Sequence, residues 1–267
     1  MKYCRFETDA GPQYGEVVDR AGILWIERLL PSFEEDPQIN NLTKPVADAI
    51  DPIPLATAKL LAPVVPRKIV CIGRNYREHA AELGNEVPKE PLLFLKTPSS
   101  LIAHNQPICI PAISQRVDFE GELAVVIGKR CSKIAPDEDV RQYIRGYTIV
   151  NDVTARDLQK SDGQWSRAKG FDSFCPAGPY VTDEIDPDAG IGVQTRLNGE
   201  LRQDGNTRDL IFPIDFLLRH ITAAITLYPG DLIPTGTPAG VSPMQPGDTV
   251  EVTIEGIGTL SNPVIMG

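Results

Sequence analysis

Short apolar stretches, many of them alternating with polar residues, recur along the chain and predict a protein built mainly from strands. Three of them lie near the start, at residues 2–7, 14–18 and 23–26, with turn-forming residues between them at 9–11 and 19–22. Strand side chains repeat every two residues, and Gly and Asp favour the turns that join strands. The start of the chain therefore predicts a small β unit.

A segment rich in proline and acidic residues follows, from residue 31 to residue 66. Weak helical patterns lie at 46–50 and 57–61, and Pro63 and Pro66 close the segment, as is typical of a linker. This change in composition predicts a domain boundary.

The rest of the chain predicts further strands, separated by turns and a few short helices. Apolar runs bounded by Gly and Pro favour strands, whereas apolar residues spaced three and four apart favour helices. Asn198 and Gly199 separate two alternating stretches and form the strongest hairpin signal in the sequence. Strands are expected at residues 68–72, 92–96, 106–110, 123–127, 147–150, 192–202, 231–234, 250–254 and 260–264.

Four helical patterns interrupt these strands, and a polar loop at 161–176 follows the third. Thr154 is a suitable residue to cap the third helix. On the last helix we expect His220 to be packed in the core. Helices are expected at residues 75–83, 137–144, 154–159 and 213–227. The expected buried face of the last helix consists of Phe216, Leu217, His220, Ile221 and Ala224.

Length and composition fit this pattern. The chain has 267 residues, enough for one large domain or for one domain with a small one attached. Its 24 Pro and 22 Gly are more than a helical bundle would tolerate. We therefore expect an α+β fold, predominantly β, with a small N-terminal domain and linker at 1–65 and a larger domain at 66–267.

The charge and the cysteines narrow the class of protein. The net charge is −10 and no basic block is present, so nucleic acid and anionic membranes are poor partners. No stretch approaches the roughly 18–20 apolar residues of a membrane span, and the first residues have no signal-peptide pattern. Five scattered cysteines without a C-x-x-C pair predict reduced, buried thiols in a cytoplasmic protein.

Three carboxylates are the first candidates for chemistry. Glu120 and Glu122 precede an apolar strand and point to the same face of it, and Asp152 ends a second apolar run. Like charges at the mouth of a buried strand repel each other, and a divalent cation removes this conflict. Carboxylate oxygens suit a hard ion such as Mg²⁺. The alternative is a pair of glutamates that is solvated or bound to Lys or Arg.

His79 and Glu82 are three residues apart on a predicted helix and so share a face. A carboxylate beside an imidazole orients the ring and raises its basicity, as a general base requires. A surface His–Glu pair is the alternative. The chain has only three histidines, without the clustering that a zinc site needs.

Two loops complete the candidates. Lys169 is flanked by small residues in the polar loop, where it is either part of a functional lid or a solvated lysine. The turn at 235–241, TGTPAGV, could present backbone N–H groups to an anion.

Seven further motifs follow one another along the chain. They are IGRNYREHAAEL (72–83), FLKTPSS (94–100), VDFEGELAVVIGKR (117–130), GYTIVNDVTARDLQ (146–159), AKGFDSFCPAGP (168–179), RLNGE (196–200) and LYPGDLIPTGTPAGV (227–241). Together they make the chain resemble the fumarylacetoacetate hydrolase family, over about residues 66–265. The shorter first part resembles that of bacterial acylpyruvate hydrolases and of mitochondrial relatives that carry the fumarylacetoacetate hydrolase domain.

The resemblance implies a mixed β-roll, usually a homodimer, with Mg²⁺ near its mouth and Mn²⁺ or Ca²⁺ as alternatives. The metal ligands of the family correspond to Glu120, Glu122 and Asp152. The catalytic residues correspond to His79, Glu82 and Lys169. Substrate contacts are expected from Arg74, Asn75, Arg156, Gln159, Ser173 and Thr237.

The resemblance also implies a small 2-oxo acid as substrate, bound to the ion. Hydrolysis of a C–C bond in a 2,4-diketo acid of the acylpyruvate or fumarylpyruvate type is the first expectation, because both His79 and Glu82 are present. Decarboxylation of oxaloacetate and keto–enol tautomerisation or isomerisation are the alternatives. A metal-binding scaffold without catalysis is a third interpretation.

Overall fold

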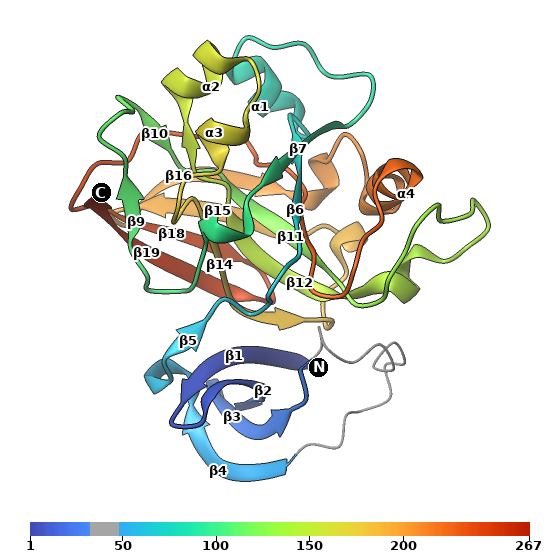
Figure 1. Ribbon diagram of the computed structural model, residues 1–267, viewed down its shortest axis with the longest axis vertical. Coiled ribbons are helices and arrows are strands. Elements are labelled where there is room, and N and C mark those ends of the chain that lie inside the picture. Colours follow the sequence, from blue (N-terminus) through green and yellow to red (C-terminus); the bar gives the residue numbers. More distant parts are fainter. Residues whose placement is uncertain (33–47) are drawn as a thin grey trace.

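The computed structural model describes residues 1–32 and 48–267, and strands dominate it (Figure 1). The first four strands form an antiparallel meander, in which each strand pairs with the next. The β unit predicted at the start of the chain is therefore confirmed. Its strands are β1 (Lys2–Thr8), β2 (Gly11–Arg20), β3 (Ile23–Leu30) and β4 (Asp48–Pro54).

The two helical patterns predicted between residues 46 and 61 are wrong where the structure describes them. Residues 46 and 47 lie outside the described part, and residues 48–50 belong to β4, because β4 pairs with β3. Residues 57–61 contain the end of a 3-10 turn (Leu55–Thr57) and the short β5 (Leu60–Leu61), which pairs with β1. In both places pairing with a neighbouring strand outweighs a weak local preference for helix.

A roll of strands lies above this meander in Figure 1. One sheet runs through both the meander and the roll, in the order β4-β3-β2-β1-β14-β12-β11-β17-β6-β7, and the roll also contains a five-stranded sheet in the order β16-β15-β18-β19-β9. The first strands of the roll are β6 (Ile69–Gly73), β7 (Leu92–Lys96), β8 (Leu101–Ile102), β9 (Ile108–Ile110), β10 (Val117–Asp118), β11 (Gly121–Ile127), β12 (Ile144–Asn151) and β13 (Thr154–Ala155). The later ones are β14 (Cys175–Thr182), β15 (Gly192–Leu197), β16 (Glu200–Asn206), β17 (Leu232–Pro234), β18 (Thr249–Ile254) and β19 (Gly258–Met266).

The strand β11 is the centre of the roll. All seven of its residues are buried, because other elements cover both of its faces. Leu123 and Val125 pack with Val252 and Ile254 of β18 in the largest apolar cluster, whereas Ala124 and Val126 belong to a second cluster on the opposite face. A strand covered on both sides is expected to be apolar throughout. Polar side chains at its start are therefore anchored in a rigid part of the molecule.

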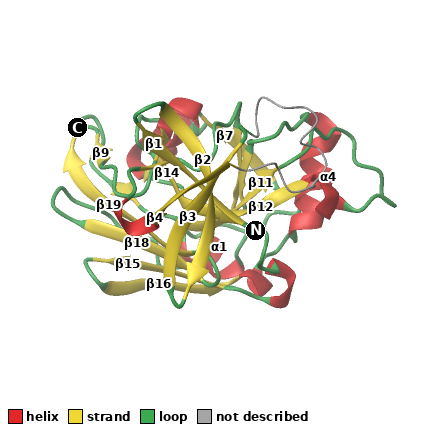
Figure 2. Ribbon diagram, turned by 90° about the horizontal axis from the view of Figure 1, so that it is seen from below, coloured by secondary structure: helices red, strands yellow, loops and turns green. Residues whose placement is uncertain are grey.

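The residues that the structure describes form four α-helices outside the sheets: α1 (Arg77–Glu82), α2 (Arg156–Asp162), α3 (Ser166–Lys169) and α4 (Ile214–Ala224). The first three gather at the end of the roll opposite the N-terminal strands, whereas α4 lies on the side of the molecule opposite β19 (Figures 1 and 2). The helical end of the roll is where the candidate residues lie.

Two details of the predicted helices are wrong. Residues 137–144 form only a 3-10 turn (Val140–Tyr143), because Ile144 already pairs with Ile127 as the first residue of β12. Ala155, not Thr154, is the residue before α2, and the Thr154 hydroxyl instead donates to the carbonyl of Asp152.

The predicted buried face of α4 is also only partly right. Leu217 and Ile221 are buried, but Phe216 is 46% exposed and Ala224 is exposed. His220 is half-buried and stacks on Phe216, so it is not a core residue. The residues of α4 that pack inward are Ile214, Leu217, Leu218, Ile221 and Thr222.

The strands of the two predicted domains are hydrogen bonded to each other, since β1 pairs with β14. The boundary near residue 65 stays a prediction. All five cysteines are free, and four are buried. Within the described residues, no helix has the length and apolar character needed to cross a membrane.

Candidate active site

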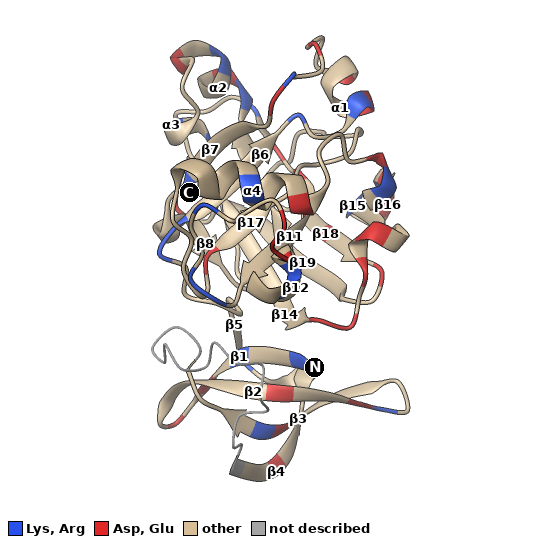
Figure 3. Ribbon diagram, turned by 90° about the vertical axis from the view of Figure 1, so that its right-hand side faces the viewer, with Lys and Arg blue, Asp and Glu red and all other residues tan. Residues whose placement is uncertain are grey.

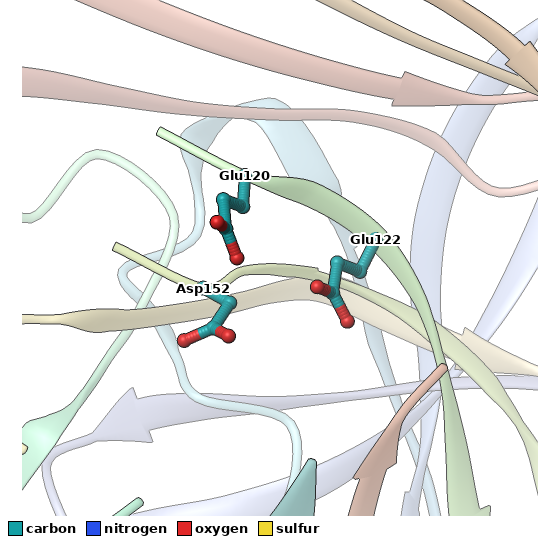
Figure 4. Close-up of side chains that lie close together, drawn as sticks. All are labelled: Glu120, Glu122 and Asp152. Atoms are coloured by element: carbon teal, nitrogen blue, oxygen red, sulfur yellow. The ribbon is translucent and has the colours of Figure 1, made fainter. Parts of the chain in front are cut away.

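The three carboxylates singled out in the sequence converge at the start of β11. Glu120 and Glu122 flank Gly121, which pairs with Asn151 at the end of β12, and Asp152 follows directly. This antiparallel register brings Asp152 beside the two glutamates, and its N–H donates to the Glu120 carbonyl at 2.8 Å. One carboxylate oxygen from each residue lies within 4.8 Å of the others, as Figure 4 illustrates. All three side chains are buried.

Side chains hold the backbone of this segment where strand pairing ends. The Asn151 side-chain carbonyl accepts the N–H of Glu120 at 2.9 Å, and that of Gln203 accepts the N–H of Gly121 at 3.0 Å. The Thr237 hydroxyl donates to the carbonyl of Gly121 and accepts from the Gln203 amide. These bonds fix the direction in which Glu120 and Glu122 leave the strand.

Buried cations face two of the three carboxylates. The Lys169 ammonium donates to Glu120 at 2.8 Å and to Asp152 at 2.6 Å, while Lys96 donates to the other oxygen of Asp152 at 2.6 Å. Arg156 approaches Glu120 at 2.5 Å and also binds Asp118. Both lysines are only 2% exposed. The alternative of pairing with Lys or Arg is thus realised for Glu120 and Asp152.

Glu122 has a different environment. It accepts the N–H of Gly236 at 2.8 Å, and no Lys or Arg of the described chain forms an ion pair with it. Burial raises the pKa of Glu122 well above its ordinary value, and the charges of Asp152 and Glu120 raise it further. One buried carboxylate is therefore left without an ion-pair partner in the described chain, within 4.8 Å of two others. A donor set of three convergent carboxylates, one of them uncompensated, fits a hard divalent cation.

The charges around Glu120 and Lys169 stabilise each other. Burial alone would raise the pKa of Glu120, but Lys169 and Arg156 outweigh it and hold this pKa well below its usual range. Burial alone would lower the pKa of Lys169, but the charges of Asp152 and Glu120 raise it. Glu120 is thus ionised and Lys169 is thus cationic at neutral pH.

His79 lies on α1 and is 4% exposed, so a solvent-exposed imidazole is excluded. Its Nδ1 lies 3.5 Å from an Oε atom of Glu82, and both carboxylate oxygens of Glu82 accept the N–H of Gly240 at 3.1 Å. Burial lowers the pKa of His79, and the charge of Glu120 opposes this shift without reversing it. The imidazole is therefore neutral at neutral pH and is able to accept a proton.

Most of these groups line one pocket of about 410 Å³. The candidates that line it are Arg74, His79, Glu120, Glu122, Arg156, Gln159, Lys169 and Thr237. The candidates that do not line it are Glu82, Asp152, Asn75 and Ser173. The Asn75 amide is fully used by backbone groups of Phe212 and Thr235, and the Ser173 hydroxyl accepts the N–H of Cys109.

The glycine turn and the polar loop differ from the expectations in detail. The N–H groups of Gly236 and Gly240 bind carboxylates of the chain itself, Glu122 and Glu82. Lys169 ends α3 and is buried, so the interpretation as a solvated loop lysine is wrong.

Several residues of the site were not found from the sequence. Lys96 could have been recognised from the sequence, because it is the last residue of an apolar strand. A lysine that is only solvated has no need of that position. Trp165 and Lys160 line the pocket, but they lie in a polar stretch without a distinctive pattern. Gln203 is fully buried, and only the fold brings it to β11.

The fold and the site define a class of β-roll proteins whose pocket ends in a buried cluster of carboxylates. The family model described as "Fumarylacetoacetate (FAA) hydrolase C-terminal" matches residues 68–265. The chain therefore belongs to the fumarylacetoacetate hydrolase family, as the sequence motifs predicted.

Named relatives in this family have different activities. The chain is 42% identical over 224 residues to the oxaloacetate tautomerase YisK of Bacillus subtilis, a match that covers 79% of this chain and 74% of that protein. The structure of 5-carboxymethyl-2-hydroxymuconate delta-isomerase from Mycobacterium smegmatis aligns over the whole of both chains, with a TM-score of 0.88 and 40% identity. The fumarylacetoacetate hydrolase of Exiguobacterium antarcticum aligns equally fully, with a TM-score of 0.85 and 37% identity.

Proposed function

We propose that this protein is a tautomerase or isomerase of a small 2-oxo acid and depends on a divalent cation. The observation that carries the proposal is the convergence of Glu120, Glu122 and Asp152 next to a buried lysine and a buried histidine. The names of two similar proteins, an oxaloacetate tautomerase and a muconate isomerase, favour this chemistry over the C–C hydrolysis that the sequence motifs put first.

The three carboxylates would hold the ion, for which we propose Mg²⁺, with Mn²⁺ and Ca²⁺ as alternatives. A bound cation would supply Lewis-acid polarisation of a substrate oxygen. Lys169 adds a positive charge beside the same carboxylates and favours negative charge that develops on the substrate. His79 is neutral and buried, and in this proposal it takes the proton from the carbon next to the keto group and gives a proton to the keto oxygen, or carries out the same transfer in reverse.

Hydrolysis of a 2,4-diketo acid is the second candidate, and the position of Glu82 favours it. Glu82 lies beside His79 and is held by Gly240, so it can orient the imidazole for activation of a water molecule. Decarboxylation of oxaloacetate needs no such water and uses the same residues.

A substrate panel separates these activities. The protein is incubated with Mg²⁺ and with oxaloacetate, acetylpyruvate or fumarylpyruvate, while the ultraviolet band of the enol and the release of pyruvate are followed. We expect the enol of oxaloacetate to disappear faster than in buffer, without pyruvate, and the effect to be lost after treatment with EDTA. Pyruvate from acetylpyruvate would establish the hydrolase, and pyruvate from oxaloacetate the decarboxylase. Inactivity on the whole panel with metal bound would favour the interpretation as a metal-binding scaffold.

Metal binding is tested on its own by titration calorimetry. We expect Glu122→Gln to weaken Mg²⁺ binding at least tenfold, because one of three charged ligands is lost. Glu200→Gln is a matched control, since Glu200 is exposed in the β15–β16 hairpin and pairs only with Arg202. Equal affinity in all three proteins would refute the metal site.

A further inference from the structure

A buried carboxylate outside the pocket, Asp118, binds an arginine of the pocket wall. Asp118 is the second residue of β10, is fully buried and does not line the pocket. Its Oδ2 accepts the Nε–H of Arg156 at 2.9 Å, and Arg156 is the first residue of α2. Figure 3 shows α2 at the end of the molecule opposite the N-terminal strands. The side chain of Asp118 is therefore linked to the pocket through Arg156.

A second arginine binds the same carboxylate from outside the pocket. Arg116 donates from Nε to Oδ1 of Asp118 at 2.9 Å and from Nη2 to Oδ2 at 3.0 Å. The side chain of Arg116 is 52% exposed and does not line the pocket, whereas that of Arg156 is 11% exposed and does. Two guanidiniums thus share one buried partner, and only one of them belongs to the pocket wall.

The backbone around Asp118 is held from two sides. Asp118 pairs with Thr154 between β10 and β13, and it also forms an isolated bridge with Pro243. The N–H of Arg156 donates to the carbonyl of Arg116 at 2.8 Å. The carboxylate of Asp118 and the start of α2 therefore have a fixed relative position.

The two remaining nitrogens of Arg156 contact other residues of the pocket. Nη1 donates to the side-chain carbonyl of Gln159 at 3.0 Å, and Nη2 lies 2.5 Å from Oε1 of Glu120. Gln159 lines the pocket, and its NH2 group has no hydrogen bond among the described residues. Because the carbonyl oxygen of Gln159 is bound by Arg156, its amide presents N–H groups to a ligand.

We infer that Asp118 is a positioning residue, which fixes the guanidinium of Arg156 and through it orients the amide of Gln159 with its N–H groups towards the substrate. A guanidinium is planar and rigid, so a hydrogen bond at Nε also sets the directions of Nη1 and Nη2. Binding sites depend on such supporting bonds to keep their contacts in place. The inference rests on the proposed function for the class of substrate, because a 2-oxo acid offers only oxygen acceptors.

The first test is structural and needs no substrate. Asp118→Leu removes both oxygens and keeps a side chain of similar length. We expect ligand-free crystal structures to show Arg156 bound to Gln159 in the parent protein and turned away from it in this variant. Arg116→Gln is the matched control, since it removes the other arginine of the same carboxylate and leaves Arg156 in place. An unmoved Arg156 in Asp118→Leu overturns the inference.

The second test measures the consequence for catalysis, with the substrate that the panel identifies and with saturating Mg²⁺. We expect KM to rise about tenfold or more in Asp118→Leu, the loss typical of a hydrogen bond to a charged group. The value of kcat changes less than threefold, because the lost contacts bind the substrate and do not react with it. Asp118→Asn recovers most of the loss, since its carbonyl oxygen can accept the same Nε–H. An unchanged KM in Asp118→Leu, or an equal rise in Arg116→Gln, overturns the positioning role.

A binding measurement separates this inference from the proposed reaction. The Mg²⁺-loaded protein is titrated calorimetrically with pyruvate, and we expect binding at least tenfold weaker in Asp118→Leu and unchanged in Arg116→Gln. If the parent protein neither binds pyruvate nor turns over any acid of the panel, the proposed function fails, and the ligand-free structures alone decide the inference. If Asp118→Leu does not fold, a crystal structure of the parent protein with Mg²⁺ and pyruvate decides it. Nε2 of Gln159 within hydrogen-bond distance of a pyruvate oxygen supports the inference, and an amide turned away from pyruvate overturns it.

Discussion

At the scale of single residues, the balance between burial and charge decides what each group in the site can do. Lys169 is the clearest case, because it is buried and its ammonium binds two carboxylates at once. Without it, the ion pairs left among the described residues would be Arg156 with Glu120 and Lys96 with Asp152. Removing one partner of a buried ion pair leaves an uncompensated charge, at a cost of about 3–5 kcal/mol.

We predict that Lys169→Met lowers kcat/KM for the active substrate at least a hundredfold and also lowers Tm in the absence of metal. Added Mg²⁺ is expected to recover part of the Tm loss, because the ion replaces a missing positive charge. Activity assays and thermal unfolding with and without Mg²⁺ measure both effects. Lys89→Met removes an exposed lysine and serves as the control. An active variant with unchanged Tm would contradict the role of Lys169.

His104 lies outside the site and predicts a pH dependence of stability. Its Nδ1 accepts the N–H of Ser261 at 3.0 Å, and burial lowers its pKa below the ordinary value of 6.5. As the pH falls through 6.5, the unfolded chain takes up a proton at this residue before the folded chain does. The free energy of unfolding therefore decreases between pH 7 and the lowered pKa.

The variant His104→Asn tests this dependence, since the asparagine side chain can accept the same hydrogen bond but does not titrate. We expect urea unfolding between pH 5 and pH 8 to show a smaller decrease towards acid pH in the variant than in the parent protein. Identical slopes would show that His104 has no part in it.

At the scale of elements, the position of the carboxylates depends on how the start of β11 is held. Gln203 on β16 binds both the N–H of Gly121 and the Thr237 hydroxyl, so a single amide joins β16, β11 and the turn at 235–241. Gly121 itself allows no side chain, because a Cβ atom would lie 2.2 Å from Thr195 Oγ1. The geometry of Glu120 and Glu122 is thus set from outside their own strand.

We predict that Gln203→Leu lowers the free energy of unfolding by about 1–3 kcal/mol, because it leaves a buried N–H unpaired. We also expect a weaker affinity for Mg²⁺, because the carboxylates lose their fixed orientation. Gln194→Leu is the control, since its amide binds Asp204 outside the site. Urea unfolding and calorimetry measure the two effects, and a destabilised variant with unchanged metal affinity would assign Gln203 a structural role only.

The elements also explain what the sequence could and could not predict. The strand at 92–96 and the hairpin at Asn198 and Gly199 carry strong local signals, and both were predicted correctly. The helices expected at 57–61 and 137–144 failed because pairing with distant strands decides those segments. No local pattern reports such pairing.

The residues of the candidate site were likewise predicted from the sequence only in part. The spacing of Glu120 and Glu122 on a strand was sufficient to place them on one face, and the apolar run before Asp152 suggested a neighbouring strand. The contacts of Lys96 and Gln203 depend on register and on packing between sheets, which the sequence does not encode locally.

At the scale of the whole molecule, hydrogen bonding between β1 and β14 joins the N-terminal strands to the roll. The chain has two tryptophans, Trp25 on β3 and Trp165 beside the pocket. Each can report on one of the two parts. The homodimer implied by the family motifs stays a prediction, which light scattering in solution would test.

We predict that both parts unfold in one cooperative transition. The variants Trp25→Phe and Trp165→Phe each keep one tryptophan as a fluorescent probe. Circular dichroism measures how far each substitution changes the stability. After correction for this change, the urea midpoints of the two variants are expected to coincide. If, within one variant, the midpoint from fluorescence differs from the midpoint from circular dichroism, the result would instead favour independent domains on either side of residue 65.

The pocket is assembled from two kinds of chain segment. Its floor comes from Glu120 and Glu122 at the start of the rigid strand β11, whereas its walls come from the turn at Gly73 and Arg74 and from α2 and α3. Laboratory evolution could therefore randomise the walls while the floor is left intact. Variants from such libraries would accept a different acid as substrate while the carboxylate cluster stays unchanged. Proteins that descend from one ancestor could have acquired different substrates in the same manner.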